Sequence, residues 1–219
     1  LAERDENGYP VNNEHTVTYA YDYSKYHMLT QKTWKRDKGT TCQIKYELDE
    51  RGNVTRETKV SSDAGSDIIT GYQYDTYGNM TEKTVNSSEN TYTTYYEYGV
   101  DLNGADHKGA FLTEEYGIKD GIKIAEHFTY DFNTGNVTAN IDQNSNKTQY
   151  EYDVLGRLVK QTNPDGSTRL YNYKEYINAN REVEYTDEEG YKFLSEYDIM
   201  GSEVKYSVYD NDAWHVIAR

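Results

Sequence analysis

The stretch Tyr150-Glu-Tyr-Asp-Val-Leu-Gly-Arg-Leu158 (YEYDVLGRL) decides the fold, because looser copies of it recur along the chain. Two of these copies read YELDERGNV from Tyr46 and YQYDTYGNM from Tyr72. In YEYDVLGRL itself, Tyr150 and Tyr152 alternate with a polar residue, which is the period of a β-strand with both rings on one face. Asp153 then fits the first position of a type I turn and Gly156 the fourth. The stretch therefore predicts a strand and the turn that reverses it.

The aspartate of this motif recurs at a nearly regular spacing. Clear copies place it at Asp22, Asp49, Asp75, Asp131, Asp153 and Asp198. Worn copies, Tyr96-Glu-Tyr-Gly99 and Tyr171-Asn-Tyr-Lys174, occupy the two longest gaps. The result is about eight units of roughly 21 to 32 residues, a spacing typical of repeat arrays. We expect one continuous repeat domain over residues 1–219, with the repeats clearest over 19–98 and 128–209.

A second turn closes each unit. After the returning strand Leu158–Thr162, the run Asn163-Pro-Asp-Gly166 has proline at the second position, where its fixed φ suits a turn. Its counterparts are Asp37–Gly39, Asp63–Gly65, Lys119–Gly121 and Asp187–Gly190. At Asp131 one extra residue precedes Gly135, so a longer turn is expected there. The segment Gly99–Glu115 breaks the pattern and is expected to be a longer loop between units.

These signals predict an all-β fold of tandem hairpins that form a curved antiparallel sheet. No stretch of a dozen residues combines helical spacing of apolar positions with proper caps. The residues expected to carry the structural repeat motif are Tyr46, Asp49, Gly52, Tyr72, Tyr74, Asp75, Gly78, Tyr130, Asp131, Gly135, Tyr150, Tyr152, Asp153, Gly156, Arg157, Pro164, Asp165, Gly166, Tyr197, Asp198 and Gly201.

The composition suits a thin sheet. Only 35% of the residues are hydrophobic, yet the chain has 25 tyrosines against 4 phenylalanines. Disordered chains are poor in aromatic residues, so tyrosine is expected to supply the buried surface while its hydroxyl stays wet. The net charge of −15 disfavours binding to nucleic acid, and no apolar run is long enough to span a membrane. The chain begins at Leu1 rather than Met, and we interpret it as a piece of a longer polypeptide.

The run from Tyr150 to Tyr173 resembles the YD repeat of the Rhs protein family nearly position for position, and the other copies match its core. That family includes bacterial Rhs and wall-associated polymorphic toxins, the C component of insecticidal toxin complexes, and animal teneurins. The resemblance implies a β-strip that coils into a hollow shell, which in the toxins encloses a C-terminal toxic domain. Many members end the repeats with a segment around Asp-Pro-x-Gly that acts in self-cleavage in some of them. This sequence has no Asp-Pro, so we expect that site and the toxin to lie elsewhere.

The regularly placed aspartates are the most tempting catalytic candidates. A turn needs a carboxylate in every repeat to accept backbone N–H groups, whereas a catalytic residue is not needed six times. The strings Asp142–Asn146 and Asp101–Asp106 resemble the start of a calcium loop, but Lys147 stands where the first loop would need glycine. We therefore predict no catalytic residue, cofactor or metal site.

Other reactive side chains have a structural interpretation too. The five histidines, His15, His27, His107, His127 and His215, show no pair at ligand spacing. The single cysteine, Cys42, lies on an expected strand and is interpreted as a small packed residue. The acidic pairs Glu114-Glu115 and Glu188-Glu189 are interpreted as solvated surface.

The function predicted is structural and non-catalytic. The chain would form part of a β-shell in a large secreted or cell-surface bacterial protein, with the rest of its own polypeptide as partner. The alternative is a carbohydrate- or cell-wall-binding module, in which the tyrosine band stacks on sugar rings. The band can equally be a cross-strand aromatic ladder that holds the sheet together, and we favour the ladder because the rings recur at the same place in every repeat.

Overall fold

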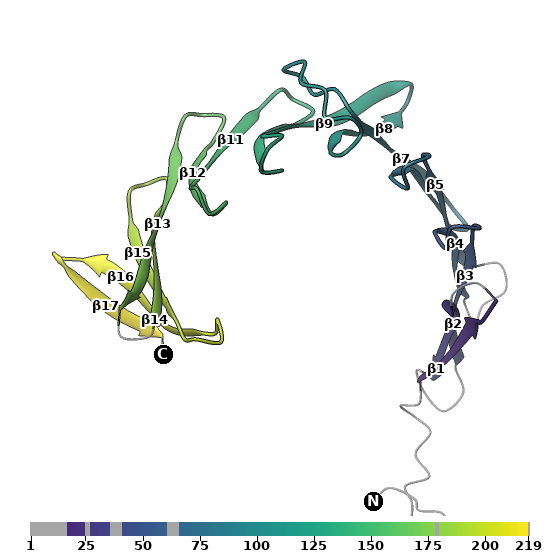
Figure 1. Cartoon of the computed structure of the whole chain (residues 1–219), viewed down its shortest axis with the longest axis horizontal. Helices are drawn as coiled ribbons and strands as arrows, with labels where there is room; N and C mark the ends of the chain where they lie inside the picture. Colours follow the sequence, from purple (N-terminus) through teal and green to yellow (C-terminus); the bar gives the residue numbers. More distant parts are fainter. Residues whose placement is uncertain (1–16, 25–26, 36–40, 61–65, 178–179, 219) are drawn as a thin grey trace, which may run out of the picture. The chain divides into compact units, whose positions relative to one another are not determined.

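The structure of the chain, a computed structural model, describes residues 17–24, 27–35, 41–60, 66–177 and 180–218. Every regular element within these ranges is a β-strand, and Figure 1 labels most of them. The predicted all-β fold class is confirmed. No helix in the described ranges is long and apolar enough to cross a membrane. The expected turns at Asp37–Gly39 and Asp63–Gly65 lie outside these ranges, and so does His15.

The described residues contain 17 strands. They are β1 (Val17–Asp22), β2 (Met28–Lys35), β3 (Thr41–Leu48), β4 (Val54–Val60), β5 (Ile68–Tyr74), β6 (Met80–Asn86), β7 (Thr91–Tyr98), β8 (Leu112–Lys119), β9 (Ile122–Tyr130), β10 (Val137–Ile141), β11 (Lys147–Tyr152), β12 (Leu158–Thr162), β13 (Thr168–Ile177), β14 (Asn180–Thr186), β15 (Lys192–Tyr197), β16 (Glu203–Asp210) and β17 (Ala213–Ala218).

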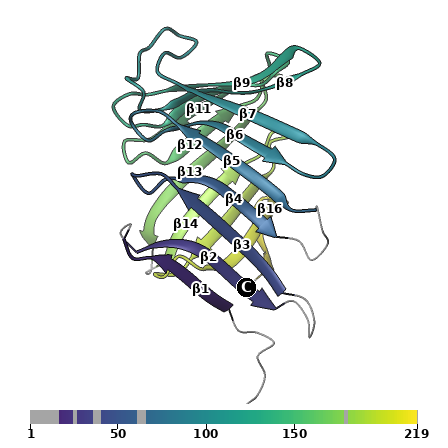
Figure 2. The ribbon, with the colours of Figure 1, turned by 90° about the vertical axis from the view of Figure 1, so that its right-hand side faces the viewer.

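Strands that follow one another in the chain pair antiparallel. Strands β1 to β7 pair in order, and Figure 2 shows them succeeding one another from β1 upward. Strands β9 to β17 also pair in order. Neighbouring antiparallel strands need only tight turns between them, so the predicted tandem hairpins are confirmed.

The chain divides into two compact units. Unit 1 comprises residues 1–97 and 115–124, and unit 2 comprises 98–114 and 125–219. Within the described residues, Ala139 and Leu194 are the buried hydrophobic side chains. Neither unit therefore has the thick apolar core of a two-layer domain, and hydrogen bonds and rings must fix its strands.

In each unit the hairpins end at two rims. The YD rim of a unit carries the turns that follow the Tyr-x-Tyr strands, at Asp49 and Asp75 in unit 1 and at Asp131, Asp153 and Asp198 in unit 2. The turns at Asp142, Asn163 and Asp187 lie at the opposite rim of unit 2. A register shift occurs one residue before the turn aspartate in all five of these YD-rim hairpins, at Leu48, Tyr74, Tyr130, Tyr152 and Tyr197. An extra residue on the returning strand there is a β-bulge, which strengthens the local twist.

The register also separates two faces in unit 2. The tyrosine face carries Tyr150, Tyr171, Tyr173, Tyr185 and Tyr197, which alternate along their strands with residues of the other face. The ion-pair face carries cross-strand pairs of opposite charge. These are Glu151–Lys160, Lys174–Glu182, Lys174–Glu184 and Glu196–Lys205. One face is therefore aromatic and the other charged.

Candidate functional site

The turn that follows each Tyr-x-Tyr strand is built around its aspartate. The Gly52 N–H donates to the Asp49 carbonyl (3.2 Å), and the Asp49 N–H donates to the Asn53 carbonyl (2.9 Å). Oδ1 of Asp49 accepts the N–H groups of Arg51 (2.9 Å) and Asn53 (2.8 Å), and Oδ2 accepts Nδ2 of Asn53 (2.9 Å). Gly52 has a φ of 89°, the left-handed conformation that glycine adopts without cost. Both carboxylate oxygens are therefore occupied within the turn.

The same arrangement recurs with different closing residues. Asp75 binds Tyr77 and Asn79, whereas Asp153 binds the N–H groups of Leu155 and Arg157 and the Nε of Arg157 (2.7 Å). Oδ1 of Asp198 accepts the backbone N–H groups of Met200 and Ser202. At Asp131 the Gly135 N–H reaches back four residues instead of three, as the extra residue requires. The aspartate is the constant part and the closing side chain varies.

At Asp49 and Asp153 these bonds lower the carboxyl pKa. The side chain of Asn53 has the largest effect on the pKa of Asp49, which lies below its ordinary value, and backbone N–H groups add to it. The pKa of Asp153 is lowered chiefly by the backbone N–H of Arg157. A carboxylate held ionised and bound on both oxygens is poorly suited to take up a proton, so the geometry favours a structural role for these residues.

Sequence reasoning missed the closing residue. Asn53 and Asn79 each donate Nδ2 to Oδ2 of the turn aspartate, and Asn146 does the same to Asp142 (2.8 Å). The signal was present as an asparagine four residues after an aspartate, which recurs in the sequence.

Two tyrosines of the motif fasten their strand to the preceding hairpin. The hydroxyl of Tyr74 on β5 donates to the Val54 carbonyl at the start of β4 (2.8 Å). In unit 2, the hydroxyl of Tyr130 on β9 donates to the Leu112 carbonyl at the start of β8 (2.8 Å). In both cases the second tyrosine of the motif spans one hairpin to bind the first residue of the strand before it. We call this contact the tyrosine bridge.

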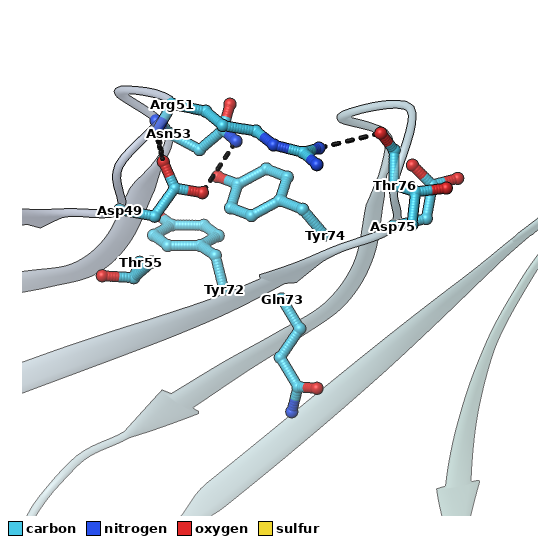
Figure 3. Close-up of a pocket in the computed structure, with 9 residues that line it drawn as sticks. All are labelled: Asp49, Arg51, Asn53, Thr55, Tyr72, Gln73, Tyr74, Asp75 and Thr76. Atoms are coloured by element: carbon cyan, nitrogen blue, oxygen red, sulfur yellow. Dashed lines mark hydrogen bonds between the residues drawn. The ribbon is translucent and has the colours of Figure 1, made fainter.

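A hollow of about 540 Å³ lies between the two YD turns of unit 1 (Figure 3). The rings of Tyr72 and Tyr74 form its floor, and Gln73 points to the other side of the strand. The guanidinium of Arg51 crosses it to donate to the Thr76 carbonyl (2.8 Å), which joins two turns 25 residues apart. Burial raises the pKa of Tyr74, and nearby Asp49 adds to the shift. The hollow is thus crossed by a contact between repeats.

A larger hollow of about 870 Å³ lies at the YD rim of unit 2. It is lined by Leu155, Arg157, Tyr171, Tyr173, Lys174, Arg181, Val183, Tyr197 and Gly201. The Arg157 guanidinium lies 4.5 Å from the centre of the Tyr173 ring, and its NH2 lies 2.6 Å from Oδ2 of Asp153. Burial raises the pKa of Tyr173, and Tyr171 adds to the rise. Arg157, singled out in the sequence as part of the motif, therefore belongs to the wall of this hollow.

The opposite rim of unit 2 has its own contact between repeats. Nδ2 of Asn163 donates to Oε1 of Glu188 (3.1 Å), and the guanidinium of Arg169 donates to both oxygens of Glu188 (2.8 and 3.1 Å). The interpretation of Glu188 as solvated surface is wrong, because its carboxylate joins two turns. Glu114 is also largely covered, with Oε1 3.8 Å from Nε2 of His127. Neither acidic pair is simply solvated.

The turn at Pro164 forms as expected, with Asn163 rather than an aspartate at its first position. The Gly166 N–H donates to the Asn163 carbonyl (2.9 Å), and Gly166 has a φ of 85°. Asp165 accepts the N–H (2.9 Å) and the hydroxyl (2.7 Å) of Ser167. Asparagine therefore replaces aspartate at the first position of this turn.

An aromatic ladder is present in unit 2, but most of its rings are not those of the motif. Stacked rings run across β13 to β16, from Tyr171 to Tyr185 (6.1 Å), to Phe193 (4.6 Å) and to Tyr206 (6.1 Å). Tyr171 belongs to a worn copy and the other three lie outside the copies we identified. Burial is the largest cause that raises the pKa of Tyr185, to about 12, and a hydrogen bond with Tyr206 contributes. The ladder supports the sheet through ring stacking, while the motif tyrosines Tyr74 and Tyr130 act through their hydroxyls.

The segment expected to be a loop is an ordered excursion of unit 2, residues 99–111. It repeats the aspartate turn at Asp101, whose Oδ1 accepts the N–H groups of Asn103 (2.8 Å) and Ala105 (3.1 Å). Its Oδ2 is bound by Nε2 of His107 (2.9 Å). The expectation of a loop through Glu115 is wrong at its end, because β8 begins at Leu112.

His107 is the centre of a packed cluster. It is 1% exposed, and the rings of Phe111, Tyr130 and Phe132 lie 5.4, 5.7 and 6.1 Å from its ring. Burial opposes ionisation of Asp101, yet the hydrogen bonds from His107 and two backbone N–H groups hold its pKa below the ordinary value. Nδ1 of His107 is buried without a hydrogen-bond partner. With so little exposure, the pair packs the excursion onto the Tyr130 hairpin.

Both strings that resemble calcium loops are turns of the repeat type. Asp142 binds Asn144 and Asn146 with the geometry of Asp49, and Ser145 takes the left-handed position with a φ of 65°. The oxygens of Asp101 are likewise bound within its own segment. No group of three or more His, Cys, Asp or Glu side chains converges within the described ranges. Cys42 lies on β3 and is partly exposed.

The remaining motif residues lie where the repeat places them. Tyr46, Tyr72, Tyr150, Tyr152 and Tyr197 lie on the strands that precede the aspartate turns. Gly78, Gly135, Gly156 and Gly201 all have positive φ at the end of those turns. The structure thus distributes the motif over successive hairpins and does not gather it into one catalytic centre.

Comparison with known proteins agrees with this geometry. The family model of the RHS repeat matches residues 128–168, which span the turns at Asp131, Asp142, Asp153 and Asn163. Residues 128–168 are thus similar to the RHS repeat. The resemblance of the sequence to the Rhs family is thereby confirmed, on the stretch that contains YEYDVLGRL. No curated protein sequence matches the chain.

Two solved structures resemble the chain in fold. The crystal structure of TcdB2-TccC3 matches 99% of this chain at 13% identity and a TM-score of 0.46. The crystal structure of TcdB2-TccC3 without its hypervariable C-terminal region matches 99% at 13% identity and a TM-score of 0.47. The chain spans about 14% and 13% of the length of those two proteins.

Proposed function

We propose that the chain is a wall segment of a larger Rhs-type protein and acts by shape. The observation that carries the proposal is the way consecutive hairpins are joined. Turn carboxylates such as that of Asp49 are bound on both oxygens, and Tyr74 and Arg51 connect one repeat to the next. Side chains that catalysis would need free are employed in holding strands together.

The RHS repeat at residues 128–168 supports the same role. In the proposal the two units are parts of one continuous array, and the array encloses or presents another segment of its own polypeptide, such as a C-terminal toxin domain. The protein would be secreted or exposed at a bacterial cell surface. The chain itself would be non-catalytic and would require no cofactor.

Limited proteolysis of the parent polypeptide tests the proposal. A segment enclosed by the array should survive a trypsin concentration that digests the same segment expressed alone. The double variant D153A/D198A removes two turn aspartates, so it should open the wall and restore digestion of the segment. The control Q143S/N144S changes the two central residues of the turn at Asp142 and keeps its aspartate, so it should leave the segment protected. Equal digestion of the segment with and without the array would contradict the proposal.

Glycan binding remains the alternative, with less support. Sugar rings stack on free aromatic faces, and several faces in this chain are covered by neighbours. Arg157 lies over Tyr173, Lys123 lies over Tyr116 at 3.9 Å, and Tyr185 is stacked between Tyr171 and Phe193. A glycan array that gave binding lost in the exposed-ring variant Tyr77→Ala would reverse this ranking.

A further inference from the structure

The tips of the two rims of unit 2 differ in chemistry. At the YD rim, where the turn at Asp131 carries Phe132 and Asn133, the central residues of the turns at Asp153 and Asp198 are aliphatic and fully or largely exposed. They are Val154 (102%), Leu155 (72%), Ile199 (75%) and Met200 (84%). At the opposite rim the central pairs are Gln143-Asn144, Pro164-Asp165 and Glu188-Glu189. A hairpin turn does not need aliphatic tips, so this difference is not a requirement of the fold.

The tips flank the larger hollow. Leu155 from the first tip and Gly201, next to Met200, both line it, and Tyr171, Tyr173 and Val183 form apolar parts of its surface. The hollow has about 870 Å³, which is room for more than one aliphatic side chain. One rim therefore presents both aliphatic projections and a recess whose surface is partly apolar and partly lined by Arg157, Lys174 and Arg181, the two elements that a self-complementary contact uses.

Charge selects this rim for contact between two copies. The chain carries a net charge of −15, so two copies repel each other over most of their surfaces. The opposite rim adds the exposed acids Asp165 and Glu189, while Glu188 there is partly covered and paired with Arg169. At the YD rim the charge of Asp153 is offset by Arg157 at 2.6 Å, and the tips themselves are uncharged. The two aliphatic tips therefore bring no charge of their own to a contact at this rim.

We propose that the YD rim of unit 2 is a self-association surface, on which the tips Val154-Leu155 and Ile199-Met200 of one copy seat in the tyrosine-lined hollow of a second copy. The contact is isologous, so each copy supplies a tip and a hollow. Exposed aliphatic groups of this size are otherwise unusual on a soluble surface, and pairing removes them from water. The proposal is independent of the shell role, because it concerns only the tips and the hollow.

Sedimentation velocity of the full chain over a range of concentrations tests the proposal. The wild-type chain should show a monomer–dimer equilibrium that strengthens between 0.1 and 0.5 M salt, as screening weakens the charge repulsion. V154S/L155S and I199S/M200S should each weaken dimerisation at least tenfold. The matched control Q143S/N144S changes two adjacent tip residues at the opposite rim and should leave the dimer unchanged. Circular dichroism should show the same fold in all variants, because the substituted side chains are exposed.

Association through strand edges is the competing outcome, and one further variant separates it. Ile217→Lys places a charge on β17, the last strand of unit 2, where it opposes the addition of another strand. Loss of the dimer in I217K with no change in the two tip variants would overturn the proposal. A wild-type chain that stays monomeric at all concentrations and in high salt would also overturn it.

Discussion

Removal of one hydroxyl from the tyrosine bridge should loosen a hairpin without disturbing its packing. Tyr74→Phe and Tyr130→Phe keep the ring and delete the donor to the carbonyls of Val54 and Leu112, each 2.8 Å away. A bond of this length between partly buried groups contributes a net of about 1 kcal/mol, and the carbonyl that loses its donor adds a few tenths. We therefore expect each variant to lower the free energy of unfolding by about 1 to 1.5 kcal/mol.

Urea unfolding followed by circular dichroism provides the measurement. With a slope of about 1 to 3 kcal/mol/M, the expected loss lowers the midpoint by about 0.3 to 1.5 M. Repeat proteins can unfold in parts, so amide exchange should accompany the urea series. In Y130F the faster exchange should be confined to the strands that flank the lost bond, β8 and β9.

The matched control is Tyr77→Phe, which removes the same hydroxyl from a ring that is 82% exposed at a turn tip. Its midpoint should equal that of the wild-type chain. If Y74F and Y130F unfold at the same urea concentration as Y77F, the tyrosine bridge does not join the hairpins and the reasoning is refuted.

Three further predictions concern pH and backbone conformation. The pKa of Tyr185 is raised to about 12, so the folded protein holds the phenol proton more tightly than the unfolded chain does. The stability that this proton gives the folded state is fully present below pH 10 and should be lost as the pH rises through 12. Y185F should show a smaller fall in urea midpoint between pH 10 and 12. Ser145 has a φ of 65°, so S145G should raise the free energy of unfolding by roughly 0.5 to 1 kcal/mol. Gly156 has a φ of 76°, so G156A should lower the free energy of unfolding by about 1 to 2 kcal/mol. Calorimetry measures both changes. The lowered pKa of Asp101 gives stability that is present above about pH 4 and lost as the pH falls through the folded value. D101N should remove this acid dependence and speed trypsin cleavage at exposed Lys108 at neutral pH.

Much of the fold follows from local signals in the sequence. The Asp-x-x-Gly spacing sets the turn, the alternation of Tyr150 and Tyr152 sets the strand face, and antiparallel hairpins need no long-range information beyond their neighbours. Register is fixed at the turn, so the strands of YEYDVLGRL could be placed to within a residue or two. The five β-bulges beside the YD-rim turns were not predicted, because a bulge depends on how the closed turn joins the paired strands.

The contacts between repeats could not be predicted in the same way. The partner of Arg51 is a carbonyl on the next turn, and Glu188 joins Asn163 and Arg169 across two turns. Such pairs depend on the spacing of hairpins in three dimensions. The burial of His107 was also missed, since a histidine far from other ligand residues gives no sign that an excursion will fold back over Tyr130.

The aspartate turn explains how the described residues, with few buried hydrophobic side chains, accommodate the excursion at 99–111. Each turn is closed by bonds within five or six residues, so the excursion at 99–111 could place a further aspartate turn at Asp101 without altering the turn at Asp131. The same local closure leaves the two central side chains of a tip outside the turn's own hydrogen bonds, because the carboxylate binds backbone N–H groups of the turn. Some of these side chains, such as Arg51 and Glu188, instead contact a neighbouring turn. Those positions vary from Glu50-Arg51 to Val154-Leu155 and Ile199-Met200. The turn's own hydrogen bonds do not require aliphatic side chains at Val154-Leu155 and Ile199-Met200, so these tips of unit 2 mark the place where a partner surface should be sought.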